Sequence, residues 1–94
     1  MTKNFKRIDY SRKFLKQLKK SPLEIKIAFR KRLGLFIQNP HHPLFNNHSL
    51  KGQYSGDRSI NLTGDWRAIF SQHEEDDGIV AIFEVIGTHS QLYK

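Results

Sequence analysis

The chain contains no cysteine and only three prolines among its 94 residues. Without cysteine it can form neither disulfide bonds nor thiolate metal sites. Long hydrophobic runs are missing too, since none approaches the roughly 20 apolar residues that span a bilayer. The charged start MTKNFKRIDY lacks the apolar segment of a signal peptide. These absences predict a small cytoplasmic protein.

Acidic residues are scarce in the first third of the chain. Residues 1–33 carry twelve Lys and Arg against two acids, a balance of +10, whereas residues 34–94 carry four against seven, a balance of −3. A basic half of this kind favours a polyanion or an acidic protein as partner. The alternative is a solvated helix face that only keeps the protein soluble. Charge alone does not distinguish one polyanion from another.

Apolar residues are frequent enough for one folded core. A hydrophobic content of 37% and an aromatic content of 12% argue against disorder. Ninety-four residues suit a single domain. We therefore expect one domain over residues 1–94.

The spacing of apolar residues predicts a short strand followed by two helices. The strand is expected over residues 3–8, and Ser11 is a candidate N-cap for a helix over residues 12–20. Ser21, Pro22 and Glu24 then match a capping box that would start the second helix. Asn39-Pro40 is expected to end that helix.

The C-terminal third predicts an antiparallel β-meander. Runs rich in Ile, Val and Phe cover residues 58–62, 66–70 and 79–86, and acidic residues 74–77 separate the last two. Alternation places Arg67 and Ile69 on the face opposite the apolar set of the second run. The predicted fold is α+β, with two N-terminal helices packed on one face of a small, antiparallel-rich β-sheet.

Polar residues near the predicted sheet are candidates for chemistry. Five histidines occur at positions 41, 42, 48, 73 and 89, and none forms a zinc-binding pattern with cysteine. His48, in a loop over residues 39–57, and His89, after the last strand, can both lie beside Arg67. A charge inside an apolar strand must be paired or face solvent or a ligand. Arg67 therefore indicates either a phosphate-binding role or a salt bridge to a nearby carboxylate.

Several motifs together resemble a known family, and they cover nearly the whole chain. These are His42-Pro43-Leu44, His48-x-Leu50-x-Gly52, Arg58-x-x-Asn61, Gly64-Asp65-Trp66-Arg67-x-Ile69-Phe70 and Gly87-Thr88-His89-x-x-Leu92-Tyr93. The chain resembles the RelE/ParE superfamily of toxins from bacterial type II toxin–antitoxin systems. Within that superfamily it is most similar to the YafQ-like mRNA interferases.

The resemblance implies an activity, partners and a set of site residues. The activity would be ribosome-dependent cleavage of mRNA by the ribose 2′-hydroxyl, without a metal or other cofactor. The partners would be a cognate acidic antitoxin and the ribosome with its mRNA, including contacts to 16S rRNA. The catalytic residues would be His48, Asp65, Arg67, His89 and Tyr93. The RNA-binding residues would be Lys51, Arg58, Asn61 and Trp66.

Two positions depart from the YafQ-like pattern. Asn61 stands where that pattern has a second histidine, and Val85 stands where it has an arginine. We hypothesise that Arg67 supplies the missing cation. Two alternatives stay open: a ParE-like inhibitor of DNA gyrase, and a catalytically decayed member that only binds its antitoxin. The sequence does not assign the acid and base roles between the two histidines.

Overall fold

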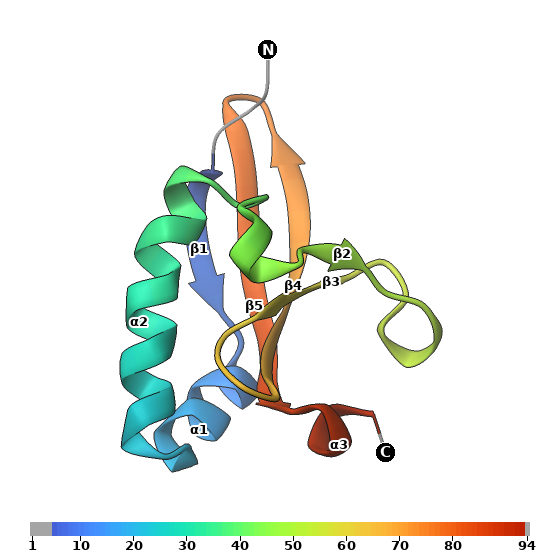
Figure 1. Ribbon diagram of the computed structural model, residues 1–94. Helices are drawn as coiled ribbons and strands as arrows, with labels where there is room; N and C mark the ends of the chain where they lie inside the picture. Colours follow the sequence, from blue (N-terminus) through green and yellow to red (C-terminus); the bar gives the residue numbers. More distant parts are fainter. Residues whose placement is uncertain (1–4, 94) are drawn as a thin grey trace.

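The computed structural model describes residues 5–93 and contains three helices against a five-stranded sheet (Figure 1). The elements are β1 Phe5–Tyr10, α1 Arg12–Lys20, α2 Leu23–Gln38, a 3-10 turn Pro43–Phe45, β2 His48–Ser49, a 3-10 turn Gly52–Tyr54, β3 Arg58–Asn61, β4 Trp66–Glu75, β5 Gly78–Thr88 and α3 His89–Leu92. Residues 3 and 4 of the expected first strand lie outside the described part of the chain.

The sheet has the order β1-β5-β4-β3-β2. Strands β3, β4 and β5 form the expected antiparallel meander, and β2 adds antiparallel to β3. Strand β1 pairs parallel with β5, so β5 has a neighbour on each side. The predicted α+β class with an antiparallel-rich sheet is confirmed.

Helices α1 and α2 cover one face of this sheet (Figure 1). The core between the two layers is mainly aromatic, and five of its rings are fully buried: Phe14, Phe36, Phe45, Phe70 and Phe83. Burying a side chain of this size contributes about 1.5–3 kcal/mol. The rings of Phe36, Phe70 and Phe83 contact one another, with centroids 5.1–5.6 Å apart. These contacts hold the helical layer on the strands that carry the candidate site.

The two helix starts differ from each other. Ser11 caps α1 as expected, because its hydroxyl accepts a hydrogen bond from the Phe14 backbone N–H at 3.0 Å. The capping box expected at Ser21 is wrong. The Ser21 hydroxyl donates to the Gln17 carbonyl at 2.8 Å and closes the end of α1, while α2 follows Pro22 without a side-chain cap. The N-cap position of α2 falls on Pro22 and not on Ser21, so the Ser21 hydroxyl is not placed to cap the second helix.

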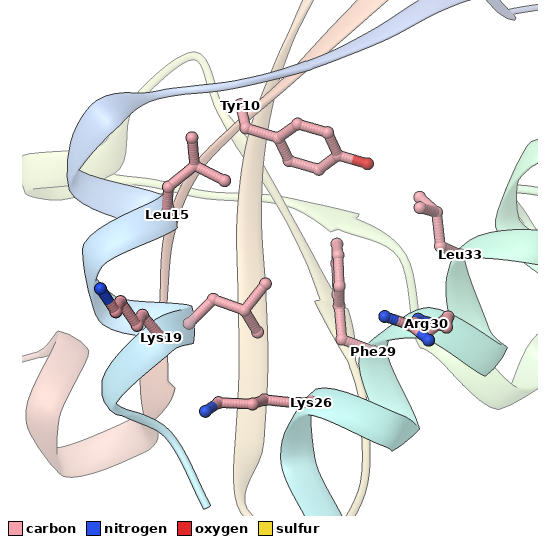
Figure 2. Close-up of a pocket in the computed structure, with 8 residues that line it drawn as sticks. Tyr10, Leu15, Lys19, Lys26, Phe29, Arg30 and Leu33 are labelled. Atoms are coloured by element: carbon pink, nitrogen blue, oxygen red, sulfur yellow. The ribbon is translucent and has the colours of Figure 1, made fainter. Parts of the chain in front are cut away.

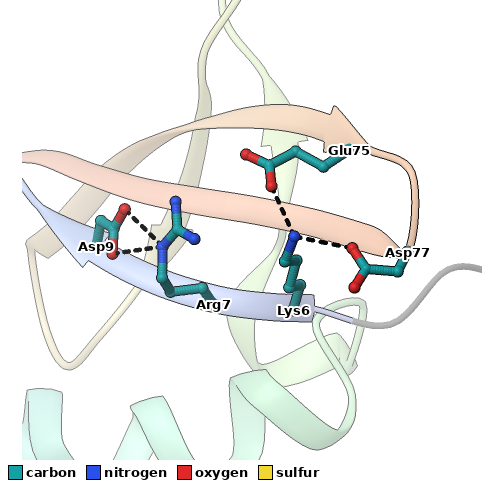
Figure 3. Close-up of polar contacts among 5 residues, drawn as sticks. All are labelled: Lys6, Arg7, Asp9, Glu75 and Asp77. Carbon is teal, nitrogen blue, oxygen red and sulfur yellow. Dashed lines mark hydrogen bonds and ion pairs between the residues drawn. The ribbon is translucent and has the colours of Figure 1, made fainter.

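Ion pairs fasten β1 to the tip of the β4–β5 hairpin (Figure 3). The Lys6 ammonium lies 2.9 Å from both Glu75 and Asp77, and Arg7 pairs with Asp9 along β1 at 3.0 Å. The acidic run therefore forms the expected exposed turn, and two of its carboxylates support the only parallel pairing in the described sheet.

No helix within residues 5–93 is both long and apolar enough to cross a membrane.

Candidate active site

Strand register aligns His48 with the face of the sheet that the helices leave free. His48 lies opposite Ser59, Ser59 opposite Ile69, and Ile69 opposite Val85. Directly opposite residues in antiparallel strands point to the same face. Ile69 and Val85 belong to a small apolar cluster that is separate from the main core. This row therefore lies on the side of the sheet away from α1 and α2.

The next row along the sheet carries the predicted cation. Arg67 lies opposite Asn61 on one side and Gly87 on the other. Its guanidinium donates a hydrogen bond to the Asn61 side-chain oxygen. Because Arg67 is two residues from Ile69 in β4, it projects from the same face as His48. No ion pair with Asp65 or Glu84 occurs among the described residues, so the salt-bridge alternative for Arg67 is wrong.

Helix α3 folds back over this face directly after Gly87. The Thr88 hydroxyl and the Gln91 side chain form a capping box at its start. The His89 backbone N–H donates to the Asp65 carbonyl at 3.2 Å. Leu92 is buried in the small apolar cluster. These contacts place His89 and Tyr93 beside the strand that carries Arg67.

The result is a pocket of ≈ 340 Å³ lined by residues from three distant segments: Asn46, His48, Arg67, His89 and Tyr93. Four of the five predicted catalytic residues line it. His48 and His89 are exposed and Arg67 is partly buried, so all three are open to a ligand. Two imidazoles and a guanidinium around one cavity can bind a phosphate and move protons to and from its ester oxygens.

A backbone contact orients the His48 ring. The His48 Nδ1 atom lies 2.7 Å from the Asn46 carbonyl oxygen. A carbonyl only accepts, so Nδ1 carries the hydrogen and Nε2 of a neutral ring is left as an acceptor. An imidazole fixed in this way presents the nitrogen that a general base needs.

Tyr93 closes the other side of the pocket. Its ring centroid lies 4.7 Å from that of His89 and 5.5 Å from that of Tyr54. Burial raises the pKa of the Tyr93 phenol, the positive charge of Arg67 partly opposes this shift, and Tyr54 adds to it. The phenol is therefore uncharged at neutral pH and can donate a hydrogen bond.

Other predicted site residues lie outside the pocket. Asp65 is exposed in the turn before β4 and meets α3 through its backbone carbonyl. Trp66 packs against the main core on the helical side of the sheet. Arg58 donates from Nε to the Asn47 side chain at 2.7 Å, near the sheet edge. Lys51 is exposed in the loop after β2.

Two asparagines also belong to the site: Asn61 contacts Arg67, and Asn46 lines the pocket. Asn61 contacts Arg67 directly, so the structure brings it to the pocket as a support for the guanidinium. Asn46 was missed by sequence reasoning. It has a positive φ of 44°, a conformation that asparagine adopts more readily than most residues. The paired asparagines before His48 were the available signal for this turn.

A second, apolar hollow lies between α1 and α2 (Figure 2), and its residues all precede those of the pocket in the sequence. It has a volume of ≈ 410 Å³ and an apolar floor that includes Phe29 and the half-exposed Leu15. Three basic side chains stand at its rim: Lys19, Lys26 and Arg30. We call this feature the helical groove. Its chemistry suits an amphipathic segment with acidic residues.

Residues 5–93 contain no group of three or more His, Asp or Glu side chains placed to hold a metal ion.

Comparison with known proteins links this fold to bacterial toxins. The profile of a family described as "Bacterial toxin of type II toxin-antitoxin system, YafQ" matches residues 3–94. The crystal structure of YafQ from E. coli strain BL21(DE3) matches at a TM-score of 0.75 and 25% identity, over 93% of this chain and 97% of that chain. No curated protein sequence matches the chain.

Two further structures extend the comparison. YafQ in the E. coli DinJ-YafQ toxin-antitoxin complex matches at a TM-score of 0.71 and 25% identity, over 93% of this chain and 96% of that chain. A YoeB/ParE toxin from Agrobacterium tumefaciens has the same TM-score at 12% identity, over 88% of this chain and 98% of that chain. At that identity the second likeness concerns the fold alone.

Proposed function

The chain belongs to the YafQ family of toxins from bacterial type II toxin–antitoxin systems, and from this premise we propose that it is an mRNA endoribonuclease acting on translating ribosomes. The observation that carries the proposal is the shared pocket of His48, Arg67, His89 and Tyr93. A protein that only binds its antitoxin has no need to gather two imidazoles and a guanidinium around an open cavity.

The proposed reaction is an internal transesterification of RNA. The ribose 2′-hydroxyl attacks the adjacent phosphorus, and His48 Nε2 takes the hydroxyl proton. The bond from phosphorus to the 5′ oxygen breaks, and His89 gives a proton to that oxygen. The products are a 2′,3′-cyclic phosphate and a free 5′-hydroxyl. Each acid–base group is expected to contribute about 10²–10⁴-fold to the rate.

Arg67 is proposed to stabilise the negative charge that develops on the phosphorane oxygens. Its hydrogen bond to Asn61 leaves the remaining guanidinium donors for the substrate. Tyr93, with its uncharged phenol, can donate a further hydrogen bond to the same oxygens. The position where related toxins carry an arginine is the buried, apolar Val85, so it adds no charge here. This supports Arg67 as the cation of the site.

The proposal is tested with purified protein and ribosomes that are translating a defined mRNA. Primer extension should reveal cuts that require the ribosome, and end analysis should find cyclic phosphates and 5′-hydroxyls. The same mRNA without ribosomes is the control. Intact mRNA, together with inhibition of purified DNA gyrase, would overturn the proposal in favour of the ParE-like alternative. Intact mRNA with no gyrase inhibition would favour the decayed member.

We further propose that the helical groove receives an acidic, amphipathic segment of the cognate antitoxin. The apolar floor offers burial, and the basic rim complements acidic side chains. Leu15→Glu should weaken binding to the antitoxin at least tenfold. The new carboxylate would lie on the apolar floor and would repel the acidic side chains of the antitoxin. Leu44→Glu, on an exposed leucine outside the groove, is the matched control. Equal binding by both variants would remove the groove from the interface.

A further inference from the structure

The carbonyl of Leu92 receives two side-chain hydrogen bonds from a loop nearly forty residues earlier in the chain. Gln53 Nε2 donates to it at 2.7 Å, and the Tyr54 hydroxyl donates at 2.9 Å. The Tyr54 ring also meets the Tyr93 ring edge-on, at 5.5 Å between centroids and 88° between planes. Both residues therefore contact the end of α3 directly.

This loop, residues 50–57, is closed on itself. The Leu50 N–H donates to the Asp57 carbonyl at 3.0 Å, and the Asp57 N–H donates to the Tyr54 carbonyl at 3.0 Å. Gly52 and Gly56 have φ of 70° and 95°, values that residues with a Cβ seldom adopt. Contacts within the loop therefore fix its backbone conformation. Little further ordering of the backbone is needed for the Gln53 and Tyr54 side chains to reach Leu92.

Helix α3 depends on such external contacts. It has four residues, far fewer than an isolated helix needs in water. Its start is held by its capping box and by the bond from His89 to Asp65. Its end is held by the buried Leu92 side chain and by the two bonds to the Leu92 carbonyl. His89 and Tyr93 stand at the two ends of this turn.

We propose that Gln53 and Tyr54 are positioning residues, which clamp α3 and so hold His89 and Tyr93 at the catalytic pocket. The inference rests on the proposed nuclease function, because it assigns a catalytic consequence to the clamp. Neither residue lines the pocket, so neither is expected to touch RNA. Their effect should appear in the rate of the chemical step and not in substrate binding.

The test uses the full chain with both donors removed, as Gln53→Ala with Tyr54→Phe. Each lost hydrogen bond should shift the docking equilibrium of α3 about fivefold. The pair is expected to lower kcat on ribosome-bound mRNA roughly tenfold or more, with KM changed less than twofold. Tyr10→Phe is the control and should keep wild-type kcat, because Tyr10 lies at the end of β1, outside the pocket, and its hydroxyl forms no hydrogen bond among residues 5–93.

A second readout needs no substrate. The Tyr93 amide donates to the His89 carbonyl at 3.0 Å, so its hydrogen exchange reports whether α3 is formed. In the double variant this exchange, followed by NMR, should accelerate at least fivefold while the melting temperature stays within a few degrees of wild type.

The two readouts separate the possible failures. Unchanged exchange at Tyr93 would overturn the clamp itself. Faster exchange with wild-type kcat would overturn its role in positioning. A wild-type protein that never cuts mRNA would overturn the proposed nuclease function and the catalytic part of this inference, whereas the exchange result would still decide the clamp.

Discussion

At the scale of single residues, the pocket contains two kinds of group: histidines that would transfer protons and an arginine that would stabilise negative charge. His48 is oriented by the Asn46 carbonyl, His89 by the first turn of α3, and Arg67 by Asn61. Each of the three is thus held by a neighbour that does not itself need to react. Preorganised groups of this kind act without reorganisation cost during the reaction.

His48→Ala and His89→Ala should each slow cleavage about a hundredfold or more, because each removes one acid–base group. The rate is to be measured in single-turnover reactions on ribosome-bound mRNA. His41→Ala, on the same loop but outside the pocket, should retain the wild-type rate. Rates within a few-fold of wild type for either pocket variant would remove that histidine from the mechanism.

Arg67→Ala should lower kcat by about 10²–10³-fold, the usual loss when a donor to a developing negative charge is removed. Cleavage is to be followed on the same ribosome-bound mRNA. Binding to the cognate antitoxin should not change, since Arg67 lies on the face of the sheet opposite the helical groove. A variant that still cuts at the wild-type rate would show that another group stabilises the negative charge on the phosphorane oxygens.

At the scale of elements, two glycines have opposite roles. Gly87 gives α3 room to fold over the sheet: an added Cβ would lie 3.0 Å from the Gln91 side-chain oxygen and 3.4 Å from a Leu92 methyl group. Gly34, inside α2, has open space at the same position. The first glycine is needed for close approach, whereas the second only weakens a helix.

Gly34→Ala should therefore stabilise the protein by about 0.5–1 kcal/mol and leave cleavage unchanged. Gly87→Ala should push α3 outwards, lowering both the melting temperature and the cleavage rate, the latter about tenfold. Thermal unfolding and single-turnover cleavage of the two variants provide the comparison. A Gly87→Ala protein with wild-type activity would mean that α3 tolerates displacement.

The loop over residues 50–57 ends at a carboxyl group with a perturbed pKa. Burial raises the pKa of Asp57, the nearby Glu84 raises it further, and His73 opposes the shift. An acid whose pKa is higher in the folded state favours folding below its unfolded pKa, and that contribution is lost as pH rises through the folded value. At neutral pH the ionised Asp57 therefore opposes folding.

Asp57→Asn should raise the melting temperature slightly near pH 7, because the partly buried charge is gone. Near pH 3 the wild-type carboxyl is protonated and the gain should disappear. Thermal unfolding of both proteins across this range measures the difference. An equal gain at both pH values would point to a cause other than ionisation.

At the scale of the whole molecule, charge and chemistry lie on different layers. The helical layer carries most of the excess positive charge, and the proposed catalytic pocket lies on the far face of the sheet. Attraction to ribosomal RNA and access of the antitoxin would both involve the helices, whereas cleavage would take place on the sheet. Long-range attraction of this kind weakens as salt screens it.

Binding to ribosomes should therefore fall steeply with salt, at least tenfold between about 50 and 200 mM. Reversing two exposed charges on α1, as Lys13→Glu with Lys16→Glu, should make that slope shallower. The control Glu74→Lys reverses a charge of the opposite sign at the hairpin end of the sheet and should not make the slope shallower. If ribosome binding does not change with salt concentration, the basic half does not contribute to ribosome recognition.

The sequence alone was sufficient for features that depend on neighbours along the chain. Apolar spacing and the Ser11 cap located α1 over residues 12–20, and alternation in β4 placed Arg67 opposite the core. The same alternation put Trp66 on the core side, where the structure has it. Such patterns are local, because helix and strand periods repeat within a few residues.

The tertiary structure decided what depends on residues far apart in the chain. Only the register of β2, β3 and β4 brought His48 onto the face of Arg67, and only packing assigned the Ser21 hydroxyl to α1. The same holds for the contacts of Gln53 and Tyr54 with Leu92. A one-residue slip in strand pairing would turn His48 to the other face without changing any local pattern, so local periodicity could not determine the pocket.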